Sequence, residues 1–103
     1  MSDAPAYVIA NFTIHDKDEY RKYEKGFFPI LKRHGGSFHT YDDNPIHFEG
    51  EGPREGRVVI FQFPSEESAK AWYNDPDYQA LSDFRRAGTA LQFITMVHGL
   101  PPR

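Results

Sequence analysis

Alternating apolar and polar side chains predict five β-strands along the chain. The clearest is residues 57–64, RVVIFQFP, where β-branched and aromatic residues run up to a proline. Residues 6–14, AYVIANFTI, carry apolar side chains on both faces of the expected strand, which is typical of a central strand. The turn sequence DDNP separates residues 37–41 from residues 46–49, which indicates a hairpin. Residues 90–99, ALQFITMVHG, predict the last strand.

Apolar residues recur at helical spacing in a first helical region, directly after the first strand. Asp16 is a good N-cap, and Glu19 three residues later completes a start that resembles a capping box. Pro29 lies inside the apolar pattern and is expected to kink the helix or split it, because proline removes a backbone donor. Gly35 and Gly36 are expected to end the helix, because glycine readily takes the left-handed conformation of a C-terminal cap.

A second helical region follows the strand at 57–64. Ser65 is its expected N-cap, and the acidic residues after it suit the positive end of the helix dipole. Asp75 and Pro76 predict a restart, with the aspartate as cap and the proline at the first helical position. Gly88 is expected to end the region. The inward stripe of its first half is expected to consist of Ala69, Trp72 and Tyr73.

The order of these elements predicts an α+β chain with the ferredoxin-like βαββαβ fold and one extra hairpin strand. The sheet should be mainly antiparallel, with both helical regions on one face. A chain of 103 residues is expected to form a single domain spanning residues 1–103. The second sheet face would then be open, and pairing of two copies through it is the expected solution. The alternative is a monomer whose sheet is half exposed to water.

Composition and charge exclude several classes of protein. The formal net charge is −3 and no basic patch appears, so we expect no nucleic-acid partner. The chain has no cysteine, which excludes disulfides and thiolate metal sites. No apolar run approaches the ~20 residues of a membrane span, and the N-terminus lacks the pattern of a signal peptide. A cytoplasmic protein with no membrane partner is therefore expected.

One charged residue lies on an apolar helical stripe, and it suggests where a ligand could bind. Arg85 follows Tyr78 and Leu81 at helical spacing. A buried guanidinium needs a partner, because burying it alone costs several kcal/mol. Arg85 could reach past the core edge or pair with a carboxylate such as Glu49. Alternatively it could anchor the anionic end of a small molecule in a pocket. The expected aromatic walls of that pocket are Trp72, Tyr73 and Tyr78.

The same part of the chain resembles a known family. The stretch FPSEESAKAWYNDPDYQALSDFR, preceded by HFEGEG and RVVIFQF, is similar to the domain-of-unknown-function family 1330 (DUF1330), and the similarity covers nearly the whole chain. The matching residues are Gly35-Gly36, Glu49-Gly50, Phe63-Pro64-Ser65, Trp72, Tyr73, Tyr78 and Arg85. The resemblance implies a subunit of the dimeric α/β-barrel group. That group includes cofactor-independent monooxygenases, lactone isomerases and haem-binding enzymes, so it implies no single reaction. The chain departs from the family pattern in a longer GEGPREG loop and in His34, where tyrosine is expected.

None of the five histidines forms a local zinc motif, and we expect no metal and no cofactor. His34 and His39 are the candidate catalytic residues, because histidine exchanges protons near neutral pH. A metal site shared by His39 and His47 across the predicted hairpin is an alternative use of those two residues.

Three functions fit these features. The first is a small-molecule-binding homodimer with a site for an anionic or aromatic ligand, acting as a cofactor-independent isomerase or monooxygenase-like enzyme on a small organic acid. The second is a ligand-binding or sensory dimer without turnover. The third is a purely structural dimer. Substrate-binding residues in the first two would be Arg85, Tyr78, Trp72, Tyr73 and Glu49.

Overall fold

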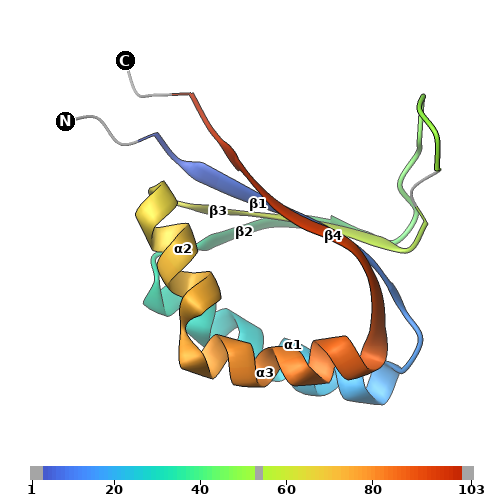
Figure 1. Ribbon diagram of the computed structural model, residues 1–103, viewed down its shortest axis with the longest axis horizontal. Helices are drawn as coiled ribbons and strands as arrows, with labels where there is room; N and C mark the ends of the chain where they lie inside the picture. The colour runs from blue at the N-terminus through green and yellow to red at the C-terminus, as the bar shows by residue number, and fades with distance from the viewer. Residues whose placement is uncertain (1–3, 53–54, 101–103) are drawn as a thin grey trace.

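Three helices cover one face of a four-stranded antiparallel sheet in the computed structural model, which describes residues 4–52 and 55–100 (Figure 1). The strands are β1 (Ala6–Ile14), β2 (Ser37–Asp42), β3 (Arg57–Phe63) and β4 (Thr89–His98). Their order in the sheet is β2-β3-β1-β4, and every neighbouring pair is antiparallel. This order confirms the ferredoxin-like fold, because β1 and β3 occupy the centre and the two other strands form the edges.

The helices begin where the capping residues predict. They are α1 (Lys17–Arg33), α2 (Glu66–Asn74) and α3 (Pro76–Gly88). Asp16 accepts hydrogen bonds from two backbone amides in the first turn of α1. Ser65 and Asp75 cap α2 and α3 in the same way, each through its side-chain oxygen. Each cap satisfies backbone donors that have no partner inside the helix.

The predicted split at Pro29 does not occur. The helix α1 runs without interruption from Lys17 to Arg33 and contains Pro29. Proline removes the amide that would bond to the carbonyl of Lys25. Both residues are exposed, so water can take the place of the missing donor on that side of the helix.

The extra hairpin strand predicted at 46–49 is also wrong. Those residues form a loop without regular structure, and the side chains of Ile46 and Phe48 are 79% and 91% exposed. The following glycines, Gly50 and Gly52, have φ angles of 102° and 74°. Such angles lie outside the extended region, so the chain turns away directly after this segment. The loop instead extends from the sheet on the side opposite the helices (Figure 1).

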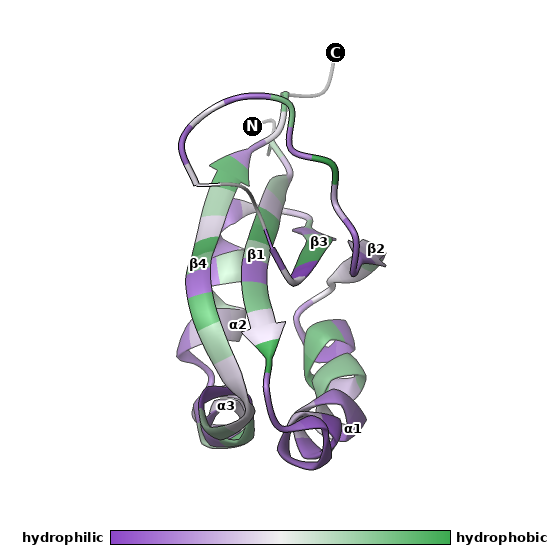
Figure 2. Cartoon of the chain, turned by 90° about the vertical axis from the view of Figure 1, so that its right-hand side faces the viewer, coloured by the Kyte–Doolittle hydropathy of each residue, from purple (hydrophilic) through white to green (hydrophobic). Residues whose placement is uncertain are grey.

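Alternation along the strands divides the side chains between the two faces of the sheet. Hydrophobic and hydrophilic residues succeed one another along β1 and β4, above the neighbouring helices α1 and α3 (Figure 2). Val8 and Phe61 are buried beneath the helices, and each pairs with the other across β1 and β3. On the opposite face Ile9 pairs with Ile60, and both are half-buried. The core therefore lies between sheet and helices, and an apolar centre remains on the open face.

No helix in the described part of the chain combines the length and apolar character needed to cross a lipid bilayer.

Candidate ligand-binding site

A cavity of about 120 Å³ lies between the helices and the inner face of the sheet. Its walls come from α1, α2, α3 and the strands above them, so residues far apart in the sequence meet there. Its lining residues include Tyr23, Phe27, Phe61, Trp72, Tyr78 and Arg85. Most of the wall is aromatic.

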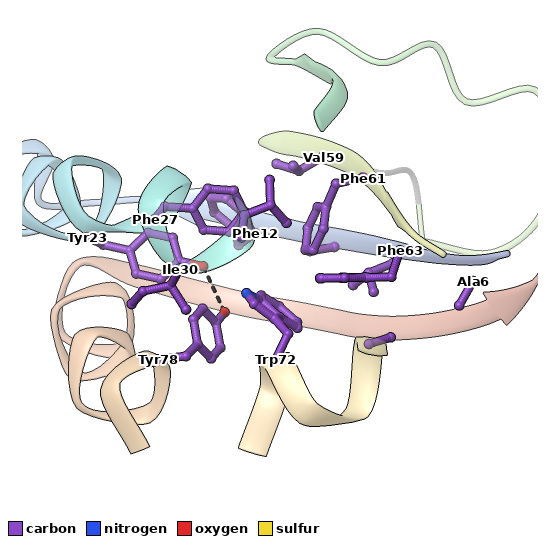
Figure 3. Close-up of a cluster of buried hydrophobic side chains, with 14 of the residues drawn as sticks. Ala6, Phe12, Tyr23, Phe27, Ile30, Val59, Phe61, Phe63, Trp72 and Tyr78 are labelled. Atoms are coloured by element: carbon purple, nitrogen blue, oxygen red, sulfur yellow. Dashed lines mark hydrogen bonds between the residues drawn. The ribbon is translucent and has the colours of Figure 1, made fainter. Parts of the chain in front are cut away.

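Edge-to-face contacts fix the aromatic walls of the cavity (Figure 3). The ring of Phe27 lies 5.4 Å from that of Phe61 at 84°, and 6.4 Å from that of Trp72 at 83°. Trp72 also packs against Tyr78, with ring centroids 4.2 Å apart. Aromatic pairs in these geometries contribute roughly 0.5–1.5 kcal/mol each beyond the burial of their area. The walls are therefore held in place by the core itself.

Two tyrosine hydroxyls form a hydrogen bond at the inner side of the cavity. The hydroxyl oxygens of Tyr23 and Tyr78 lie 2.8 Å apart, and either group can donate (Figure 3). Burial raises the pKa of Tyr23 well above its usual range, with a further contribution from Tyr78. The hydroxyl of Tyr23 thus keeps its proton at neutral pH and acts as a polar, uncharged group.

Arg85 brings a positive charge into this apolar environment. Its side chain belongs to α3, is only 3% exposed, and lines the cavity. The guanidinium carbon lies 5.8 Å from the centre of the Tyr23 ring. Within the described part of the chain, no carboxylate forms a salt bridge with Arg85, and its Nε has no hydrogen-bond partner. The ring of Tyr23 offers this guanidinium a cation–π contact, but no carboxylate of the described residues neutralises its charge and its buried Nε–H lacks an acceptor.

Arg57 is a second cation at the cavity, and its charge is already compensated. Its Nε and Nη2 donate to the two carboxylate oxygens of Asp43 at 2.7 and 3.1 Å. Glu24 lies 3.5 Å from Nη1. The hydrogen bond to Arg57 lowers the pKa of Asp43, and the same bond raises the pKa of Arg57. Because Glu24 is half exposed, this cluster marks the mouth of the cavity, whereas Arg85 marks its interior.

The ring of Tyr20 lies against the guanidinium of Arg57 and lines the cavity beside it. Tyr20 has its pKa raised to about 12, mainly by burial, although the nearby charge of Arg57 opposes the shift. The phenol is therefore protonated at neutral pH. In the described part of the cavity wall, Arg85 is accordingly the one permanent charge without a partner of opposite sign.

A further buried donor lines the same cavity as Arg85. The side chain of Trp72 is 1% exposed, and its Nε1 has no hydrogen-bond partner in the described residues. The indole nitrogen lies on the side of the ring that faces the hydroxyl of Tyr78 (Figure 3). Buried polar groups are paired in the large majority of cases, so two unpaired donors at one cavity need an explanation.

The structure brings three of the five expected substrate-binding residues together and leaves two outside. Arg85, Trp72 and Tyr78 line the cavity, whereas Tyr73 and Glu49 do not. Tyr73 is 40% exposed, because consecutive residues of a helix point about 100° apart and the position of Trp72 already faces the sheet. Its ring instead lines a separate cavity of about 240 Å³ beside α2 and β4. Glu49 is exposed in the loop after β2, because the hairpin strand that would have oriented it does not form.

The two histidines proposed as catalytic residues also lie away from the cavity. His34 follows α1, and its Nε2 lies 2.8 Å from a carboxylate oxygen of Asp75. His39 lies in β2, and its Nε2 is 2.7 Å from the side-chain oxygen of Gln62. Neither imidazole lines the cavity.

Several lining residues were not identified from the sequence, although a signal for them exists. Phe61 falls on the inner face of β3 by simple alternation, and Phe27 continues the inward stripe of α1. Either position becomes a candidate once the strand and helix are known to face each other. Arg57 and Glu24 give no such signal, because their meeting depends on the packing of α1 against the start of β3.

The family resemblance of the sequence is confirmed over nearly the whole chain. Residues 5–100 match the family model described as "Domain of unknown function (DUF1330)". The chain belongs to the DUF1330 family. A search of curated proteins found no match.

Solved structures support the same fold for this DUF1330 protein. A protein of unknown function from Rhodopseudomonas palustris has a TM-score of 0.74 at 16% identity, with 97% of this chain and 85% of that one covered. SnoaB, a cofactor-independent oxygenase from Streptomyces nogalater, has a TM-score of 0.62 at 14% identity, covering 92% and 91%. A putative antibiotic biosynthesis monooxygenase from Chloroflexus aurantiacus has a TM-score of 0.58 at 16% identity, covering 96% of each chain. At these identities the likeness concerns the fold, and the fold alone does not define a reaction.

Proposed function

We propose that this DUF1330 protein binds a small organic acid in the cavity beneath its helices, with Arg85 as the anchor. One observation supports this function above all. Arg85 is 3% exposed, lines the cavity, and has no carboxylate partner in the described residues. An arriving carboxylate would restore the charge-assisted hydrogen bonds that burial removes, and a guanidinium offers a planar set of donors that matches it.

Catalysis is the second candidate, and the tyrosine pair is the observation that favours it. The hydroxyls of Tyr23 and Tyr78 are hydrogen-bonded to each other in the cavity wall, where they could donate hydrogen bonds or a proton to a bound acid. The similarity of the fold to that of a cofactor-independent oxygenase is consistent with such a role. Simple binding has better support, because Glu24 at the mouth is the one carboxylate and no histidine is present among the described lining residues.

A thermal-shift screen against small carboxylates tests the binding function. A ligand at ten times its dissociation constant stabilises the native state by about 1.4 kcal/mol, since only the folded chain binds it. For a domain of this size, that corresponds to a rise in Tm of roughly 5–10 °C. Arg85→Gln should lose the rise, while Arg86→Gln should retain it. Arg86 is the matched control, because it is the next residue of α3 and its side chain is 45% exposed in a pair with Asp83.

Two results would speak against the proposed function. One is an unchanged Tm with every carboxylate tested. The other is an equal rise in the wild type and in Arg85→Gln. Incubation of the protein with the acid that binds, followed by mass spectrometry, then separates the two candidates: an unchanged acid supports binding alone, and a converted acid supports catalysis.

We further infer that the protein works as a homodimer joined through the open face of its sheet. The half-buried pair of Ile9 and Ile60 lies at the centre of that face on the two central strands. An apolar centre surrounded by polar strand ends suits a symmetric interface between two copies.

A further inference from the structure

We propose that the acid bound at Arg85 is a single-ring aromatic carboxylate of the benzoate class, a proposal that rests on the function proposed above. Three properties of the cavity support this choice of ligand: its size, its aromatic walls, and the positions of its two unpaired donors.

The size of the cavity fits one six-membered ring. Its volume is about 120 Å³. An engineered protein cavity of about 150 Å³ lined by apolar side chains holds benzene, so a single ring is close to the upper limit here. Fused rings would require the walls to move, and the walls are core residues packed against one another. A two-carbon acid such as acetate would leave most of the apolar wall without a partner.

The walls favour a flat unsaturated ring over a saturated one. Phe27, Phe61 and Trp72 present their rings to each other in edge-to-face contacts around the cavity. A further aromatic ring can join such contacts, since the positive edge of one ring faces the negative face of the next. The gain over a saturated ring of equal size corresponds to a factor of roughly three to ten in affinity.

The donors favour a carboxylate over a neutral polar group. Arg85 supplies a fixed positive charge, and Trp72 contributes an N–H that can donate but cannot accept. Both side chains are more than nine-tenths buried and line the same cavity. A carboxylate has acceptors only, and its negative charge compensates the guanidinium. A neutral amide or alcohol could accept the hydrogen bonds but would leave the charge uncompensated.

The charges at the mouth of the cavity indicate how the bound ligand is oriented. Arg57 there is engaged by Asp43 and lies near Glu24, so the cluster carries two acids for one base. A carboxylate is therefore repelled at the mouth and attracted at the interior. The ring should lie against the wall formed by Phe27 and Phe61, with the carboxylate toward Arg85.

The chain carries its own probe for this site. Trp72 is its one tryptophan and lines the cavity, so intrinsic fluorescence reports on ligands that enter. Titration with benzoate, cyclohexanecarboxylate, acetate, 1-naphthoate and benzyl alcohol, repeated by calorimetry, gives the dissociation constants. We expect benzoate to bind roughly three to ten times more tightly than cyclohexanecarboxylate. Acetate, 1-naphthoate and benzyl alcohol should each bind more weakly than benzoate.

Variants of the anchor link the affinity to the site. Arg85→Gln should weaken benzoate by roughly ten- to a hundredfold, as expected for the loss of a hydrogen bond to a charged group. Arg86→Gln should leave it unchanged. Arg85→Lys keeps the charge without the planar arrangement of donors, so its affinity should lie between those of the wild type and Arg85→Gln. If Arg85→Gln does not fold, the affinity of Arg85→Lys can still be compared with that of the wild type.

The outcomes separate this proposal from the function on which it rests. Binding of acetate and cyclohexanecarboxylate as tightly as benzoate, lost in Arg85→Gln, would overturn the ligand class and leave the acid-binding function standing. Benzyl alcohol bound as tightly as benzoate, with Arg85→Gln unaffected, would overturn both. The absence of binding by every carboxylate would also overturn both.

Discussion

At the scale of single residues, the hydroxyls of Tyr23 and Tyr78 illustrate how a buried polar contact depends on both partners. The two groups are 2.8 Å apart, and both rings belong to the core. Removing one hydroxyl leaves the other without a partner in a site that water reaches poorly. Removing both replaces a polar pair by two apolar rings of nearly the same shape.

This difference gives a double-mutant prediction. Tyr23→Phe and Tyr78→Phe should each lower the free energy of unfolding by about 1–3 kcal/mol, the cost of an unpaired buried group. The double variant should lose less than the sum of the two, because no hydroxyl is then left unpaired. Urea unfolding of the four proteins at 25 °C measures the coupling. Strictly additive losses would show that the two hydroxyls do not depend on each other.

The sequence predicts the buried position of Arg85 but not its surroundings. Helical spacing from Tyr78 placed Arg85 on the inner stripe, and its exposure of 3% confirms that position. The same reasoning failed for Tyr73. Trp72 and Tyr73 are adjacent in the helix, and the apolar pattern alone does not show which of them faces the sheet. The alternative in which Arg85 pairs with a carboxylate such as Glu49 is not realised, because Glu49 is exposed in the loop after β2. Local periodicity thus finds the side of a helix, whereas contacts between distant segments require the packing itself.

At the scale of elements, Asp75 joins the end of α1 to the start of α3. Its carboxylate accepts from the backbone amide of Asp77 at 2.8 Å and lies 2.8 Å from Nε2 of His34. Arg33 donates to the same carboxylate at 3.0 Å. These bonds lower the pKa of Asp75, with the bond to His34 as the largest cause and that to the amide of Asp77 as the next.

Because the pKa of Asp75 is lowered in the folded state, the free energy of unfolding depends on pH. The stabilisation from the ionised carboxylate is fully present above its ordinary pKa of about 3.9, and it is lost as the pH falls through the lower folded-state value. Wild type should therefore exceed Asp75→Asn in unfolding free energy at pH 6, and the difference should shrink below about pH 4. Urea unfolding between pH 2 and pH 6 tests this. Asp83→Asn is the control, because that side chain is 80% exposed and should matter little at any pH. A constant difference for Asp75→Asn across the range would contradict the assignment.

Substitution by alanine should affect stability differently at two glycines in the helices, Gly26 and Gly88. A Cβ at Gly88 would lie 2.8 Å from the backbone oxygen of Asp16 and 3.0 Å from the backbone nitrogen of Tyr20, neither of which can yield. A Cβ at Gly26 would meet Leu81 at 2.7 Å, but there the contact is the end of a flexible side chain.

Gly88→Ala should therefore be destabilising by roughly 1–3 kcal/mol, the usual cost of overpacking, despite the better helix propensity of alanine. Gly26→Ala should be close to neutral, because the gain in propensity offsets a small movement of Leu81. Thermal unfolding followed by circular dichroism compares the two variants. A Gly88→Ala protein as stable as Gly26→Ala would mean that α3 can shift away from the start of α1 at little cost.

Helix ends were predictable from the sequence because their causes are local. A cap such as Asp16 or Ser65 bonds to amides only two or three residues away, so residue type and spacing suffice. The strand expected at 46–49 failed for the opposite reason, since a strand needs a partner edge that may come from anywhere in the chain. Pro29 was tolerated because its missing donor falls on the exposed side of α1, and which side is exposed depends on how α1 packs against the sheet.

At the scale of the whole molecule, the two faces of the sheet differ in what covers them. Helices bury one face (Figure 1). The other face carries the pair of Ile9 and Ile60 at its centre, and Val97 on the edge strand β4. Half-buried aliphatic residues on a free face gain stability when water is removed from them. The proposed homodimer would provide that cover, and it would leave the cavity on the opposite side of each sheet accessible.

A single added charge at the centre of the open face tests the dimer. Ile60→Lys should give a monomer in size-exclusion chromatography with light scattering, because two lysines would meet at the symmetric interface and each would lose its water. In the monomer the same lysine can extend into solvent, so circular dichroism should show an intact fold. Ala80→Lys adds the same charge at an exposed position of α3 and should remain dimeric. A wild-type protein that elutes as a monomer, or an Ile60→Lys protein that remains a dimer, would contradict an interface on this face, because neither result is compatible with two copies burying the same central pair.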